Sequence, residues 1–153
     1  MMLNNIKIAI GADHRGYQLK EYLKNNFMLA ETSIEWVDVG AYTQERSDYP
    51  EFSINVAKLV QEKKVTVGIL ICGTGVGMVI AANRFSGVYA GLAWNQEIAR
   101  LAKEDDHTNI LVLPADFISL EEGANMLYSW LTAECKQGRY AQRMQMIDAI
   151  RGC

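Results

Sequence analysis

One stretch of the chain decides its fold class: VGILICGTGVGMVIAANR, residues 67–84. It opens with a short apolar run, residues 67–72, which is the length of one buried strand. Glycines at alternate positions follow, and residues 76–84 then show the apolar spacing of a helix. A strand that passes through a glycine-rich loop into a helix is typical of a doubly wound parallel sheet.

The same alternation extends along the chain on both sides of this stretch. Further apolar runs of strand length lie at residues 6–10, 34–39, 88–93 and 110–113. Helical patterns lie at residues 19–27, 52–60, 96–103 and 120–135. We therefore predict an α/β fold: a single domain over residues 1–153, built as a three-layer α/β/α Rossmann-like sandwich around a five-stranded parallel sheet.

Composition narrows the classes of function. The 153 residues carry a formal net charge of -3, so there is no basic field and we expect no nucleic-acid partner. The longest apolar run, around residues 69–82, is interrupted by glycines and Thr74, so we expect no membrane span. The first five residues lack the charged and apolar regions of a signal peptide, which predicts a cytoplasmic protein.

The three cysteines, Cys72, Cys135 and Cys153, are odd in number and widely spaced. There is no CxxC pair and no histidine at zinc spacing, so we expect three reduced thiols and no metal site. Cys135 falls inside the helical pattern at residues 120–135, where we assign it to packing.

Ligands of doubly wound sheets bind where the carboxyl ends of the strands meet the amino ends of helices. The first strand ends in Asp13-His14-Arg15, which places three consecutive ionisable side chains at this edge and favours a binding site. Asp13 alone has a second interpretation that stays open, because an aspartate at this position can also cap the following helix.

The third strand ends in Cys72 and the loop that contains Gly73, Gly75 and Gly77. These glycines allow close approach of a ligand to backbone N–H groups, which favours an anion site, although the pattern is neither GxGxxG nor a Walker loop. Cys72 directly precedes a helix, which predicts a lowered thiol pKa. Two plainer interpretations stay open: the loop is only a tight turn, and the cysteine is only packed in the core.

Several further side chains are candidates for the site. Arg139 and Arg143 stand four residues apart, a spacing that suits either phosphate binding or a solvated charged helix face. His107 follows three acidic residues and is either a loop residue or an acid/base group. Tyr49-Pro50 is predicted to begin a helix, because proline fits the first helical turn.

The last segment, about residues 139–151, is predicted to be helical. It carries Met144, Met146, Ile147 and Ile150, which make it too apolar for a free tail. It packs either on a partner subunit or back onto its own domain, and the sequence leaves both open. We assign Trp94 and the other tryptophans to packing.

Four segments occur in a familiar order: GADHRGY at 11–17, ERSDYP at 45–50, ICGTGVGM at 71–78 and GRYAQR at 138–143. Over nearly its whole length the chain resembles the type B ribose-5-phosphate isomerases, a family that also contains galactose-6-phosphate and allose-6-phosphate isomerases. The resemblance implies an aldose-ketose isomerase of the pentose phosphate pathway that uses no metal and no organic cofactor. It also implies a homodimer with shared active sites, or a tetramer built from such dimers.

The resemblance also implies roles for individual residues. The proton-transferring base falls on Cys72, and Thr74 assists at the sugar oxygens. Residues that line the sugar pocket and help to open its ring are Asp13, His14 and Tyr49. The amides that face developing negative charge belong to Gly73, Thr74, Gly75, Val76 and Gly77. The phosphate-binding arginines contributed by the neighbouring subunit are Arg139 and Arg143.

The chain departs from the family pattern before the fifth strand. Asp105 stands at the position of the ring-opening histidine, and Asp106 stands at that of a neighbouring asparagine. His107 comes two residues after Asp105, so it either replaces the missing acid/base group or only lies near it.

A second departure concerns the phosphate. Asp116 stands where the family pattern usually has a phosphate-binding arginine, and Tyr140 stands where histidine is common. Losing a charged hydrogen bond costs about 1.5 to 3 kcal/mol, so phosphate affinity is expected to fall unless another cation compensates. The candidates for that cation are Arg15, Arg46 and Arg84.

Three hypotheses follow. The leading one is interconversion of ribose 5-phosphate and ribulose 5-phosphate through an enediolate. A second keeps this mechanism but takes a six-carbon sugar phosphate, either allose 6-phosphate or galactose 6-phosphate. A third, motivated by Asp105 and Asp116, is a sugar-phosphate-binding protein without catalysis.

Overall fold

The computed structural model describes residues 5–150. Its strands are β1 (Asn5–Ala12), β2 (Ser33–Asp38), β3 (Val67–Cys72), β4 (Ala90–Leu92) and β5 (Ile110–Pro114). Its helices are α1 (Tyr17–Asn26), α2 (Tyr49–Gln61), α3 (Val76–Ala82), α4 (Gln96–Asp106), α5 (Leu120–Thr132) and α6 (Arg139–Asp148).

The strands form one parallel sheet in the order β2-β1-β3-β5-β4. Since β1 leads outward to β2 while β3 leads toward β4 and β5, the order reverses between β1 and β3. The carboxyl ends of these two central strands therefore border the crevice in which such sheets bind ligands. The register places Ala12 opposite Ile71, and Cys72 opposite Pro114 of β5.

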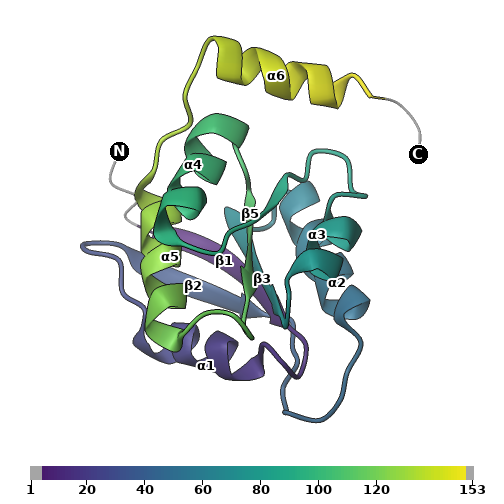
Figure 1. Ribbon diagram of the computed structural model, residues 1–153, viewed down its shortest axis with the longest axis vertical. Helices are drawn as coiled ribbons and strands as arrows, with labels where there is room; N and C mark the ends of the chain where they lie inside the picture. Colours follow the sequence, from purple (N-terminus) through teal and green to yellow (C-terminus); the bar gives the residue numbers. More distant parts are fainter. Residues whose placement is uncertain (1–4, 151–153) are drawn as a thin grey trace.

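Helices cover both faces of this sheet, as Figure 1 shows. One face packs against α1, α4 and α5, and its core contains Leu23, Leu127 and Trp130, all fully buried. The other face packs against α2 and α3, through Val56 and Met78. The predicted three-layer α/β/α sandwich around a five-stranded parallel sheet is confirmed.

Local signals explain where the helices begin. Pro50 lies in the first turn of α2, as its sequence position predicts. At the start of α5 the Ser119 hydroxyl accepts a hydrogen bond from the Glu122 amide, and the Glu122 carboxylate accepts one from the Ser119 amide. This reciprocal cap satisfies two amides that the helix itself leaves free.

Several predicted elements are shorter than expected, and tertiary contacts explain two of them. The helix predicted over residues 120–135 ends at Thr132, so Cys135 lies in the extended segment that leads to α6. Lys136 explains this, because its ammonium pairs with both Glu104 and Asp105 and draws the chain along α4. Cys72 and Cys135 are free thiols, and Cys153 lies outside the described residues.

The strand predicted over residues 88–93 is reduced to Ala90–Leu92. At the start of this strand, asparagine side chains make hydrogen bonds in place of a neighbouring strand. The Asn109 side chain accepts a hydrogen bond from the Tyr89 amide at 2.8 Å. The Asn83 side chain accepts one from the Ala90 amide and donates one to the Ala90 carbonyl. This short strand is one edge of the sheet.

Helix α6 stands apart from the sandwich, above α4 in Figure 1. Met144 is its one buried side chain among residues 139–148, whereas Met146, Ile147 and Ile150 are largely exposed. A groove of about 1030 Å³ beside β4 is lined by Ile80, Trp94, Met144, Ile147 and Ile150, among others. The assignment of Trp94 to packing within one chain was wrong, because 57% of this residue is exposed.

Over residues 5–150, no helix has both the length and the apolar character needed to cross a membrane.

Candidate active site

The crevice between β1 and β3 contains a buried thiol. Cys72 ends β3 with 5% of its surface exposed, and its Sγ accepts a hydrogen bond from the Gly75 amide at 3.1 Å. Gly75 has a φ of 77°, in the left-handed region, and this conformation turns the chain from the strand into α3. The glycine loop therefore curls around the sulfur and directs backbone N–H groups at it.

The thiol pKa differs from the prediction. Burial raises the pKa of the Cys72 thiol, and the negative charge of Asp13 adds to this increase. Hydrogen bonds from the amides of Gly75, Met78 and Thr74 act in the opposite direction but do not outweigh burial. The prediction of a lowered thiol pKa was therefore wrong for the single chain, because it counted the loop amides and not the desolvation.

Asp13 lies at the end of β1, on the other side of the crevice, and is 5% exposed. One carboxylate oxygen accepts hydrogen bonds from the amides of Arg15 and Gly16, at 3.0 and 3.1 Å. The side chain thus shapes the turn that leads into α1, although Gly16 and not Asp13 is the capping residue of that helix. The interpretation of Asp13 as the helix cap was therefore wrong, and its negative charge acts on the Cys72 thiol across the crevice.

The loop after β2 meets His14 of the loop after β1 and leads to Tyr49, and both of these residues are candidates for the site. His14 and Ser47 exchange hydrogen bonds: the His14 amide donates to the Ser47 hydroxyl, and the Ser47 amide donates to His14 Nδ1. Tyr49 packs against Gly77, where a Cβ would lie 2.4 Å from the tyrosine ring. Glycine at this position is therefore needed for the tyrosine to lie against the loop.

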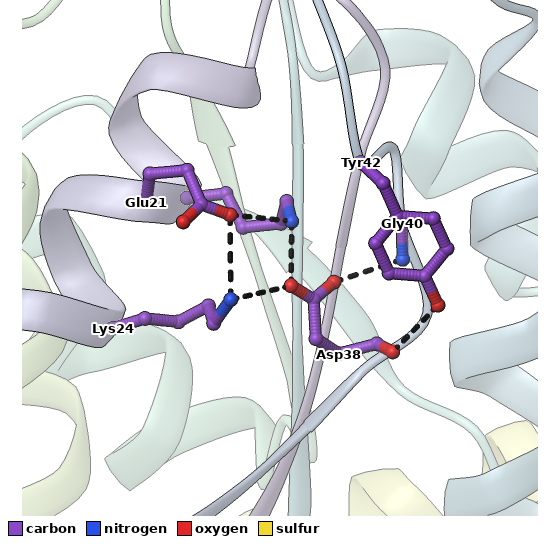
Figure 2. A network of polar contacts seen from close by, with 6 residues as sticks. Glu21, Lys24, Asp38, Gly40 and Tyr42 are labelled. Atoms are coloured by element: carbon purple, nitrogen blue, oxygen red, sulfur yellow. Dashed lines mark hydrogen bonds and ion pairs between the residues drawn. The ribbon is translucent and has the colours of Figure 1, made fainter.

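A buried ionic network holds the start of the same loop, as Figure 2 shows. Asp38 accepts hydrogen bonds from Lys20 at 2.7 Å, from Lys24 at 2.6 Å and from the Gly40 amide at 2.9 Å. Tyr42 donates its hydroxyl to the Asp38 carbonyl. This network was not predicted from the sequence, where its local signal is a lysine, Lys20, on the inward face of the first helix.

The exposed side of the glycine loop carries Thr74. Its hydroxyl accepts a hydrogen bond from the Val76 amide at 3.3 Å, while most of the residue faces solvent. Above Gly73, the guanidinium of Arg15 forms an ion pair with Asp116. Of the three arginines considered as compensation for Asp116, Arg15 is thus the one that contacts it, whereas Arg84 lines the groove beside β4.

The remaining candidates do not reach Cys72 within one chain. Asp105, Asp106 and His107 precede β5 and therefore lie at the amino-terminal edge of the sheet, roughly 13 Å from its carboxyl edge at 3.3 Å per strand residue. His107 Nε2 bonds to the Lys136 carbonyl at 2.6 Å. In the part of the chain that the structure describes, no three His, Cys, Asp or Glu side chains gather in a way that would hold a metal ion.

The two arginines of α6 are both exposed, and they too lie away from the crevice. Arg143 lies over the ring of Tyr140, with 5.5 Å between the guanidinium carbon and the ring centroid. A single chain therefore presents the thiol, the loop amides and Asp13 at one edge, and Arg139, Arg143 and His107 elsewhere.

These features define a class: a doubly wound α/β protein with a buried thiol and an amide-lined loop at the switch point of its sheet. A family model described as Ribose/Galactose Isomerase matches residues 8–147, and the chain belongs to this family. The resemblance seen in the sequence is thereby confirmed.

Individual relatives agree with this assignment. Ribose-5-phosphate isomerase B of Escherichia coli (strain K12) is 40% identical over 144 residues, which cover 94% of this chain and 95% of the relative. A ribose 5-phosphate isomerase crystal structure from Thermotoga maritima superposes with a TM-score of 0.89 at 39% identity, over 95% of this chain and 99% of that one. Ribose-5-phosphate isomerase B from Mycoplasma genitalium, solved with bound ribulose 5-phosphate, has a TM-score of 0.83 at 35% identity, over 96% of each chain.

Proposed function

We propose that this chain interconverts ribose 5-phosphate and ribulose 5-phosphate. The observation that carries the proposal is the Cys72 sulfur at the switch point, in contact with the Gly75 amide and near the Asp13 carboxylate. Family membership and the relatives' names support an isomerase that acts on a sugar phosphate. We take residues 1–153 as one domain, since a single sheet carries this edge.

The chemistry assigns a step to each group. Cys72 acts as the base that removes the proton from carbon 2 of the open-chain aldose and returns it to carbon 1 of the enediolate. The amides of residues 73–77 stabilise the oxygen charge of that intermediate, and removal of one such donor typically costs about 3 to 4 kcal/mol. Thr74 bonds to the sugar hydroxyls, while Asp13, His14 and Tyr49 hold the sugar for ring opening.

A second copy of the chain completes the site. Arg139 and Arg143 are exposed on a helix that stands apart from its own sheet, beside an apolar groove at the β4 edge. A two-fold axis that passes this edge perpendicular to the strands sets the strands of two copies antiparallel, so the amino-terminal edge of one sheet meets the carboxyl edge of the other. The partner's arginines then bind the phosphate in a shared site of a homodimer.

His107 is the better candidate for the group that opens the sugar ring from the partner side. Its Nε2 lies 2.6 Å from a carbonyl oxygen and so carries the proton, which leaves Nδ1 as an acceptor in the neutral ring. Asp105, in contrast, is already paired with the Lys136 ammonium at 2.7 Å. Asp106 is exposed and lines the apolar groove at the proposed subunit contact.

A cytoplasmic location accompanies this mechanism. Cys72 must remain a free thiol to act as a base, and reducing compartments preserve free thiols.

The partner's guanidinium groups also favour the thiolate, which offsets the effect of burial on the thiol.

The direct test is the isomerisation of ribose 5-phosphate by wild type and by Cys72→Ala. The mutant is expected to lose activity by a thousandfold or more while its dimer and its fold persist. Cys135→Ala is the matched control, because it removes a free thiol that lies outside the crevice. Isomerisation retained in Cys72→Ala would refute the assignment of the base, and an inactive wild type would refute the substrate.

A further inference from the structure

The ion pair between Arg15 and Asp116 lies directly on the glycine loop. A Cβ at Gly73 would lie 2.7 Å from Arg15 Nε, 2.8 Å from Arg15 Cζ and 2.7 Å from Asp116 Oδ2. Gly73 is the residue that follows Cys72, so the guanidinium and the carboxylate lie at the mouth of the crevice. They come from the loops after β1 and β5, the two strands that flank β3.

The guanidinium is only partly used by this pair. Its Nη2 donates to Asp116, and the side chain is 55% exposed. Among residues 5–150, Asp116 is the only ion-pair partner of the Arg15 side chain. Arginine carries five N–H donors in a fixed plane, so most of them are free for a second anion.

The charge at this mouth also needs an explanation. Asp116 alone would repel a sugar phosphate, because it puts a carboxylate beside the amides that are proposed to bind an anion. The pair as a whole is neutral, and Asp116 holds one corner of the guanidinium while the rest of the plane lies along the loop. Two anions on different edges of one arginine are an arrangement that its planar fork allows.

We propose that Arg15 binds the phosphate of the substrate in this protein and that Asp116 positions it. The family pattern usually has a phosphate-binding arginine at position 116, in the loop after β5. In this protein the loop after β1 supplies the phosphate-binding cation instead, through Arg15. This inference rests on the proposed function for the identity of the substrate, and it singles out Arg15 from the three arginines considered as compensation for Asp116.

The test combines a substrate and an inorganic probe. For Arg15→Gln, KM for ribose 5-phosphate and the dissociation constant of inorganic phosphate are both expected to increase tenfold or more, with kcat within a few-fold of wild type. Lys64→Gln is the matched control, since it removes the same charge from an exposed pair with Glu62, at the far end of α2. Unchanged KM and phosphate affinity in Arg15→Gln would overturn the proposal.

A second variant separates charge from geometry. Arg15→Lys keeps the positive charge but cannot bond to Asp116 and to phosphate through one plane, so its KM is expected between those of wild type and Arg15→Gln. A KM equal to that of wild type in both variants would overturn the proposal. If wild type fails to isomerise ribose 5-phosphate, the proposed function fails, whereas a weaker affinity of Arg15→Gln for inorganic phosphate would still support the role of Arg15.

Discussion

Two ion pairs beside helix α1 each join a basic side chain to an aspartate, but they differ in how many hydrogen-bond donors of the basic side chain remain unused. Lys20 is completely buried and bonds to both Asp38 and Glu21, and its ammonium also lies over the rings of Tyr17 and Tyr42. Figure 2 shows that Asp38 is held as fully, by Lys24 and the Gly40 amide among others. The pair of Arg15 with Asp116 is exposed and uses one corner of the guanidinium.

Unused hydrogen-bond donors distinguish a charged residue that can bind a ligand from one that only stabilises the fold. In the network around Asp38 every hydrogen-bond partner comes from the protein. These bonds stabilise the packing of α1 against β2 and the following loop. In the Arg15 pair, the donors that remain point to a ligand. An exposed pair contributes at most about 1 kcal/mol to stability, whereas disruption of a buried pair is costly.

The largest effect is expected when the buried network is broken. Lys20→Met leaves the partly buried Asp38 without one of its two lysines, and should lower the free energy of unfolding by about 3 kcal/mol. Arg15→Met is the matched control and should change it by less than about 0.5 kcal/mol. Urea unfolding at pH 7 measures both, and equal losses in the two variants would remove the contrast between the pairs.

Acid should also weaken the network around Asp38, because protonation of this carboxylate removes its ion pairs with Lys20 and Lys24. Burial alone would raise the pKa of Asp38, but hydrogen bonds from Lys20, Lys24 and Gly40 outweigh it and lower that pKa below its ordinary value of 3.8. A lowered pKa stabilises the fold fully above the ordinary value, and this stability is lost as pH falls through the folded value.

Urea unfolding between pH 5 and 3 checks this expectation. The free energy of unfolding of wild type should fall more steeply over this range than that of Asp38→Asn, which has no carboxylate to protonate there. Parallel slopes for the two proteins would show that Asp38 does not contribute to acid unfolding.

The smallest effect is expected from Asp116→Asn, which sharpens the view of the open pair. The amide oxygen still accepts a hydrogen bond from Arg15, but the negative charge beside the phosphate is gone. KM for ribose 5-phosphate is therefore expected to fall by roughly threefold to tenfold, on the scale of an exposed charge interaction. An increase in KM would instead show that the charge of Asp116 is needed to hold Arg15.

Much of the fold and half of the site could be predicted because their signals are local. The order of strand, glycine loop and helix around Cys72, and the ionisable run after the first strand, are each read within a few residues. The pairing of Arg15 with Asp116 joins residues 101 positions apart, and it follows only once β1 and β5 are known to flank β3.

Two errors have the same origin. The raised thiol pKa of Cys72 depends on burial by elements distant in sequence, which no local pattern measures. The early end of α5 depends on Lys136, whose partners Glu104 and Asp105 belong to another helix. In both cases tertiary packing outweighed a local propensity.

In the proposed homodimer, each active site combines the thiol of one chain with the arginines of another. Two variants test it most directly: Cys72→Ala, and the double variant Arg139→Ala with Arg143→Ala, each nearly inactive alone. Co-refolded in equal amounts, they form mixed dimers in which one site has an intact thiol and intact arginines, so about a quarter of wild-type activity should return. A mixture no more active than its two components would contradict the shared site.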